Sequence, residues 1–86
     1  MKYDEAVINA FLEQQSKLFR EPVAETYEEA EEYLAGVDAA VFDDVKKLLE
    51  YMDRLGYDVT GVPEEDVIDE AEVFEVSDGR YLFVEG

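Results

Sequence analysis

The side chains that could do chemistry in this 86-residue chain are carboxylates. There are 24 Asp and Glu residues against seven Lys and Arg, and neither His nor Cys occurs. Adjacent acids such as Asp43-Asp44 and Glu64-Glu65-Asp66 could serve general acid–base catalysis or hold a divalent cation. No base or electrophile lies beside them, however, and the spacing of a calcium-binding loop is absent around Asp58 and Asp78. The sequence therefore predicts a protein that is not an enzyme and that has no catalytic residues, no cofactor and no dedicated metal site.

Several other functions are disfavoured by composition. The formal net charge of −17 repels phosphate backbones and anionic lipid headgroups, so we expect no direct contact with nucleic acid or with a membrane surface. Glycine-rich phosphate-binding motifs and the motif of a serine nucleophile are absent. The first ten residues lack the apolar core of a signal peptide, which favours a cytoplasmic protein.

The acids are concentrated in two blocks. Residues 21–44 contain nine acids and no Lys or Arg, and residues 56–78 again contain nine acids and none. Such blocks favour a negative surface that steers a basic protein partner, although acids also simply keep a small domain soluble. The candidate partner-binding residues are Glu28, Glu29, Glu31, Glu32, Glu64, Glu65, Asp66 and Asp69.

Periodicity and capping signals predict helices that would position these acids. We expect helices over 4–19, 27–35, 44–55 and 64–70. Asp4 is a candidate N-cap, Thr26 and Glu29 form a capping box, and Asp43 or Asp44 caps the third helix. Gly36 and Gly56 are the expected αL stops of the second and third helices.

The closing residues predict an antiparallel hairpin over 72–85. Asp78-Gly79 suits a two-residue type I′ turn, which would set Val76 opposite Tyr81 and Phe74 opposite Phe83. If the third helix covers the face of Phe74, Val76, Tyr81 and Phe83, the other face needs helix one, a third strand or another molecule to cover Val73, Leu82 and Val84. The apolar run 37–42 is compatible with a strand at 38–42 or with the lead-in to the next helix.

These elements predict a single α+β domain over 1–86, with about four helices on a C-terminal antiparallel hairpin. The length suits one hydrophobic core. The residues expected in that core are Val7, Phe11, Leu18, Val45, Leu48, Leu49, Met52, Phe74, Val76 and Phe83.

Two phrases, "EPVAETYEEAEEYLAG" and "SDGRYLFVEG", resemble segments of short acidic bacterial proteins that have no assigned function. This resemblance covers about a third of the chain. It implies a free-standing bacterial domain and transfers no site residues, because neither phrase contains a catalytic motif.

The functional hypothesis is a non-enzymatic interaction or regulatory module that binds a protein partner through its acidic surface and the hairpin edge. One alternative is a carboxylate-based divalent-cation binder or small enzyme. The other is a structural module that forms a homodimer by adding strand to strand, so the expected state is a monomer or a homodimer.

Overall fold

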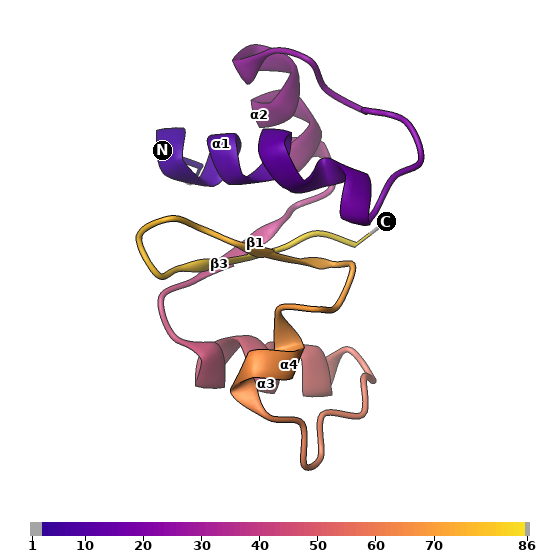
Figure 1. The fold of residues 1–86 in the computed structure, drawn as a ribbon, viewed down its shortest axis with the longest axis vertical. Coiled ribbons are helices and arrows are strands. Elements are labelled where there is room, and N and C mark those ends of the chain that lie inside the picture. The colour runs from indigo at the N-terminus through magenta and orange to yellow at the C-terminus, as the bar shows by residue number, and fades with distance from the viewer. Residues whose placement is uncertain (1–2, 86) are drawn as a thin grey trace.

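The computed structural model describes residues 3–85, and for Glu64 it describes the backbone alone. The fold is α+β, with a three-stranded sheet between two layers of helices (Figure 1). One layer consists of α1 and α2, and the other of α3 and α4. In chain order the elements are α1 (Glu5–Gln14), the 3₁₀ turn η1 (Gln15–Lys17), α2 (Tyr27–Gly36), β1 (Ala40–Phe42), α3 (Val45–Arg54), α4 (Glu64–Val67), β2 (Val73–Glu75) and β3 (Tyr81–Phe83).

The helices begin where the capping signals place them. The Asp4 carboxylate accepts the Val7 N–H at 3.1 Å, and Asp44 rather than Asp43 caps α3. Thr26 and Glu29 form the predicted capping box. Two helices end several residues before their predicted ends: the chain tightens into η1 after Gln14, and α4 stops at Val67. The third helix is shorter than predicted by one residue at each end.

The C-terminal ends of α2 and α3 differ in the residue that turns the chain. Gly56 has φ +100°, and the Tyr57 N–H bonds the Met52 carbonyl, so the predicted stop of α3 is confirmed. The predicted stop at Gly36 is wrong, since Gly36 is the last helical residue of α2. The positive φ falls on Asp38, at +52°, where aspartate tolerates the αL conformation better than most residues.

The sheet has the order β1-β3-β2 and both pairs of strands are antiparallel. The run at 38–42 thus contributes a strand. The predicted hairpin register is wrong by one residue: Phe74 lies opposite Leu82, and Val73 lies opposite Phe83. A type I′ turn needs positive φ at two residues, but in this turn only Gly79 has it. The loop therefore has three residues, 77–79, closed by the Val76 N–H on the Arg80 carbonyl at 2.9 Å.

Both faces of the hairpin are buried within the chain. Phe74, Val76 and Leu82 pack with α1 and α2, whereas Val73 and Phe83 pack with Leu48 and Met52 of α3. The one-residue change of register thus exchanges partners between the faces. Phe74 and Val76 face α1 and α2, so the third helix does not cover their side of the hairpin. Of the ten residues predicted for the core, seven are buried and three are half-buried, namely Leu18, Val45 and Leu49.

Candidate functional site

The predicted partner-binding acids are divided between the two layers. Glu28, Glu29, Glu31 and Glu32 lie on α2, whereas Glu65 and Asp66 lie on α4 and Asp69 follows it. The side chain of Glu64 lies outside the described residues. Since the sheet separates α2 from α4 (Figure 1), these acids do not form one continuous patch.

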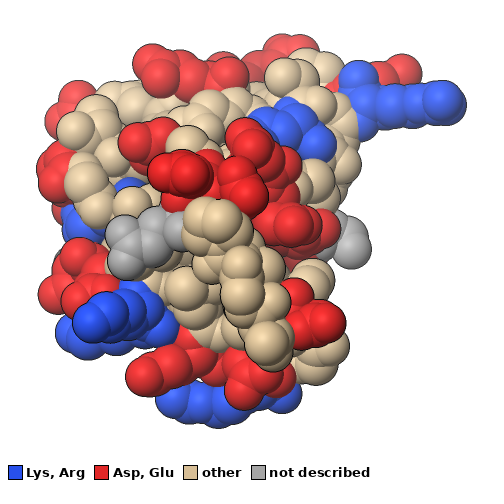
Figure 2. Space-filling model, turned by 60° about the horizontal axis from the view of Figure 1, so that its bottom comes forward, with Lys and Arg blue, Asp and Glu red and all other residues tan. Residues whose placement is uncertain are grey.

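The individual acids also differ in availability. Glu28 and Glu32 are exposed, but the Glu29 carboxylate accepts the N–H groups of Glu25 and Thr26. Glu31 is half-buried, and its Oε2 has no hydrogen-bond partner among the described residues. Glu65, Asp66 and Asp69 are exposed. Figure 2, which turns the lower layer of Figure 1 towards the viewer, shows acids across this face and bases in separate patches near its margins.

The outer edge of the hairpin is covered by the chain itself. Residues 72 and 76 of this arm bond through their backbones to residues 84 and 80, which flank β3. The backbone groups of Val73 and Glu75 therefore point away from the sheet. The Gln14 amide donates to the Glu75 carbonyl at 2.8 Å and accepts the Glu75 N–H at 3.4 Å. Lys17 donates to the Val73 carbonyl, and the Val73 N–H bonds the Glu70 carbonyl. The prediction that the hairpin edge receives a partner strand is therefore corrected, because no backbone group of β2 is left to pair.

The opposite edge of the sheet, on β1, has few backbone groups that are open to an added strand. Alternation across the sheet directs the backbone of Val41 outwards. The preceding outward residue, Ala39, already donates to the Leu34 carbonyl and accepts the Tyr3 hydroxyl at 2.6 Å. A single open residue within β1 is a short template for strand addition, so the homodimer hypothesis gains no support from this edge.

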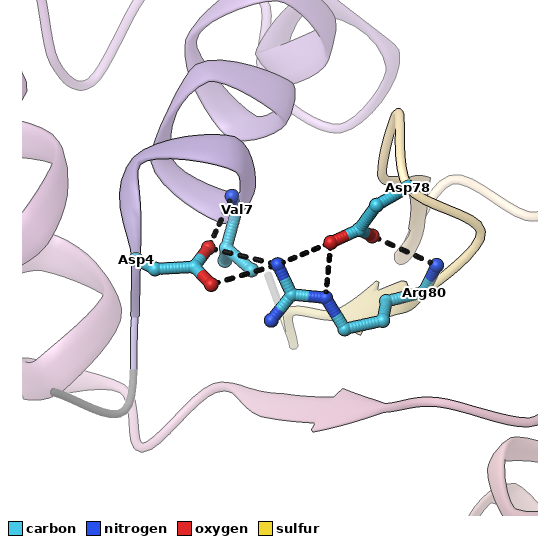
Figure 3. Close-up of polar contacts among 4 residues, drawn as sticks. All are labelled: Asp4, Val7, Asp78 and Arg80. Atoms are coloured by element: carbon cyan, nitrogen blue, oxygen red, sulfur yellow. Dashed lines mark hydrogen bonds and ion pairs between the residues drawn. The ribbon is translucent and has the colours of Figure 1, made fainter.

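A cluster of polar contacts surrounds Arg80 at the hairpin turn (Figure 3). Its Nη2 atom contacts both Asp4 carboxylate oxygens, at 2.8 and 2.9 Å, and its Nε donates to Asp78 at 2.8 Å. These hydrogen bonds lower the pKa of both carboxyl groups and raise the pKa of the guanidinium. The cluster fastens the start of α1 to the hairpin turn, and every charge in it has a partner, which indicates a structural role.

A hollow of about 650 Å³ lies between the end of η1, the end of α3 and the base of the hairpin. We call it the helix-end pocket. Its apolar lining comes from Leu18, Phe19, Leu55 and Tyr57, with Gly56 between the last two. Two carboxylates, Glu72 and Glu85, complete the wall.

The two charged side chains that line the helix-end pocket are both carboxylates. Glu72 is half-buried, and its Oε2 atom is buried without a hydrogen-bond partner among residues 3–85. Burial raises the pKa of the Tyr57 hydroxyl, and Glu72, Glu85 and Glu70 raise it further. This phenol therefore stays protonated at neutral pH and can accept or donate a hydrogen bond.

Lys17, in η1, already bonds groups of the protein. Lys17 donates to the carbonyls of Ile68 and Val73, and its ammonium lies 5.8 Å from the centre of the Phe74 ring. Burial lowers the pKa of Lys17, while Asp69, Glu75, Glu70 and Glu72 act in the opposite direction. We call Asp69, Glu70, Glu72 and Glu85 the acidic rim. Glu72 and Glu85 line the pocket, and Asp69 and Glu70 lie just before Glu72 in the chain.

Sequence reasoning named Asp69 but not the other three members of the acidic rim. The usable signal was the hairpin, since any register near the predicted one brings Glu72 and Glu85 to the same end of the sheet. The observed bond between the Val84 N–H and the Glu72 carbonyl, at 2.9 Å, places them there. The apolar wall could not be foreseen, because it requires the ends of η1 and α3 to meet across the sheet.

A second hollow, of about 570 Å³, lies between α1 and the hairpin turn and is lined by Asn9, Glu13, Ser77 and neighbouring residues. Among the side chains that the structure describes, no group of three or more Asp or Glu residues is arranged to hold a metal ion. Among the same residues, no helix has the length and apolar character needed to cross a bilayer.

Comparison with known proteins gives no further guide to the site. No protein-family model matches the chain, and no curated protein and no solved structure is significantly similar to it.

Proposed function

We propose that this chain is a non-enzymatic interaction module of the cytoplasm that binds a basic protein through its acidic surface, and that the acidic rim forms the centre of that surface. The supporting observation is that Glu72 and Glu85 line one hollow and that Asp69 and Glu70 lie three and two residues before Glu72 in the chain. Three of them are exposed, so they are accessible to a partner.

Charge balance supports a basic partner rather than an acidic or neutral one. The chain has only seven Lys and Arg residues, and Lys17, Lys47 and Arg80 already bond groups of the protein. An unneutralised negative field speeds association with a positive surface and disfavours acidic competitors. The hairpin edge plays no part in this proposal, because Gln14 and Lys17 cover it.

The test begins with affinity capture on the immobilised protein, followed by purification of any captured basic protein. The dissociation constant of the complex is then measured at about 0.05 M salt and at about 0.5 M salt. At the higher concentration the Debye length is only a few ångströms. We expect a marked loss of affinity at the higher salt concentration. Salt-insensitive binding would contradict the proposal.

A pair of charge-matched triple variants locates the surface. The rim variant carries Asp69→Asn, Glu70→Gln and Glu85→Gln, and the control carries Glu25→Gln, Glu28→Gln and Glu32→Gln, which are exposed in or beside α2. The rim variant should weaken binding about tenfold, because each exposed pair contributes about 0.2 to 1 kcal/mol. Equal losses in both variants would show that total charge, not the acidic rim, controls binding.

A further inference from the structure

The hairpin turn contains the only place in the sequence where glycine follows an Asp or Asn residue, at Asp78-Gly79. In such a pair the backbone nitrogen of the glycine can attack the side-chain carboxyl carbon of the aspartate, because glycine has no side chain to obstruct the approach. Both residues are exposed. A Cβ built on Gly79 would meet no atom of a described residue within 4 Å, its chain neighbours excepted. Neither burial nor crowding therefore prevents this reaction at the turn.

The reaction is a rearrangement of the chain that needs no cofactor. The Gly79 nitrogen forms a bond to Cγ of Asp78, and the hydroxyl of the protonated carboxyl leaves with the amide proton as water. Hydrolysis of the resulting succinimide ring adds one water back. Cleavage of the ring at Cγ restores aspartate. Cleavage at the main-chain carbonyl carbon leaves isoaspartate, in which the chain runs through Cγ and the α-carboxylate is free.

The folded turn engages both of the reacting groups (Figure 3). The Oδ1 atom of Asp78 accepts the Arg80 N–H at 3.2 Å, while Oδ2 accepts Nε of the same arginine at 2.8 Å and lies 2.7 Å from Nη2. The attacking Gly79 N–H donates to the Val76 carbonyl at 3.0 Å. Ring closure thus requires the carboxylate to leave the arginine and the amide to leave its acceptor.

Arg80 also holds the Asp78 carboxyl in its less reactive protonation state. Its hydrogen bonds lower the pKa of that carboxyl, so the group is ionised at neutral pH. A carboxylate loses an oxygen much less readily than a carboxylic acid does. Arg80 is itself held in place, since its Nη2 atom contacts both Asp4 carboxylate oxygens at 2.8 and 2.9 Å. Hydrogen bonds between charged groups are the stronger kind, so the cluster keeps the turn closed.

We propose that Asp78-Gly79 is a latent site of isoaspartate formation and that Arg80 is the positioning residue that keeps it latent. The reaction proceeds when the turn opens, either locally or together with the whole fold. Isoaspartate therefore accumulates in molecules that open often. Its main chain is one carbon longer between residues 78 and 79, so the product does not restore the original turn and leaves a lasting record of the opening.

Peptide mapping of aged protein tests this assignment. The parent and Arg80→Gln are incubated at neutral pH, well below the temperature of unfolding. Electron-transfer fragmentation then gives the fraction of isoaspartate at residue 78 over several weeks. Arg80→Gln should form isoaspartate about fivefold faster than the parent, which is the largest factor expected from loss of an exposed ion pair.

An unfolded reference shows how far the fold suppresses the reaction. A synthetic peptide of residues 74–83 contains the same turn sequence without the helices that hold it. The peptide should form isoaspartate faster than the folded parent and faster than folded Arg80→Gln. The same peptide with Arg80→Gln corrects for any effect of the substitution on the unfolded chain.

A control variant separates the contact of Arg80 from a general loss of stability. Thr26→Ala removes the capping hydroxyl of α2, on an element away from the turn. A low concentration of urea is added to the more stable of the two variants, so that Thr26→Ala and Arg80→Gln have the same free energy of unfolding. Under these conditions Arg80→Gln should still react faster at residue 78, because its turn opens locally.

A third variant tests the support that Asp4 gives to Arg80. Asp4→Asn keeps a side chain that can cap α1 but removes the charge that faces the guanidinium. It should raise the rate less than Arg80→Gln does, because the bonds between Arg80 and Asp78 remain.

Three outcomes would overturn the inference. Equal rates in the parent and in Arg80→Gln would show that the arginine does not restrain the carboxylate. Equal rates in Arg80→Gln and Thr26→Ala at matched stability would show that global unfolding, and not the turn, controls the reaction. A folded parent that reacts as fast as the peptide would show that the site is not latent.

Discussion

The two helix layers cover the same sheet in different ways. The layer of α1 and α2 encloses a cluster of thirteen buried residues, including Phe11, Phe74 and Leu82. The layer of α3 and α4 shares a cluster of only five, in which Leu48 and Phe83 are surrounded by half-buried rings. The first layer is a conventional core, while the second is a thin apolar cover.

Polar contacts sharpen this difference. Gln14 and Lys17, from α1 and η1, bond the backbone of β2, and Arg80 of the hairpin arm bonds Asp4 at the start of α1. The side chain of Gln15, only 7% exposed, holds the linker after η1 through bonds to Val23 and Ala24. The described side chains of α3 and α4 pack with the sheet through apolar and aromatic contacts, among them Tyr51 with Phe42 and Phe83. The layer of α3 and α4 is thus held on the sheet by apolar and aromatic packing. The layer of α1 and α2 is positioned on the sheet by hydrogen bonds as well.

The largest expected loss of stability follows truncation of one buried side chain in each cluster. Phe11→Ala should lower the free energy of unfolding by about 3 to 5 kcal/mol, and Leu48→Ala by about 2 to 5 kcal/mol. Both side chains are fully buried, but the cavity at Leu48 is closer to half-buried neighbours that can collapse into it. Denaturant titration followed by circular dichroism measures both losses. A loss well under about 1 kcal/mol for Leu48→Ala would show that α3 is not part of the core.

A smaller effect is expected at the C-terminal ends of α2 and α3. Gly36→Ala should stabilise the protein by about 0.5 to 1 kcal/mol, because Gly36 is helical and an added Cβ meets no atom within 4 Å. Gly56→Ala should destabilise it by about 1 to 2 kcal/mol, since φ is +100° there. Thermal unfolding of the two variants gives the signs directly. If both variants changed the stability in the same direction, the chain after α2 would not reverse at Asp38, as assigned, but at Gly36.

The smallest effect concerns Arg80, which links the first layer to the hairpin turn. The hydrogen bonds of Arg80 lower the pKa of Asp4 and Asp78 in the folded state. The stability that these bonds contribute is therefore fully present above the pKa of an Asp in the unfolded chain, which is about 3.9. It is lost as the pH falls through the lower folded pKa values. The difference in stability between the parent and Arg80→Gln should therefore be constant above about pH 5 and shrink towards pH 2. Urea titrations at matched pH values measure this difference, and a gap that widened in acid would contradict the linkage.

Local signals predicted much of this fold. Capping residues located the start of three helices, since Asp4, Thr26 and Asp44 each act on backbone groups within three residues. The same locality explains the errors. Gly36 looked like a stop, but the chain continues the helix through it and turns at Asp38, because the conformation at this end depends on how β1 joins the sheet.

The register and the site depend on contacts far apart in the sequence. A type I′ turn and a three-residue loop are both compatible with Asp78-Gly79, and the choice decides which apolar residues face which layer. The helix-end pocket requires Phe19, Tyr57 and Glu85 to converge from three parts of the chain. No local pattern carries that information. Charge blocks indicated where acids are abundant, but not which of them surround a hollow.

The position of β3 has a consequence for biosynthesis. Of the described strands it is the last in sequence order, yet it is the central strand and contributes residues to both buried clusters. A nascent chain that has released only β1 and β2 from the ribosome has two strands that do not pair with each other. Neither apolar side can close until Leu82, Phe83 and Val84 emerge, so folding must follow their release and the earlier segments remain exposed to chaperones and proteases until then.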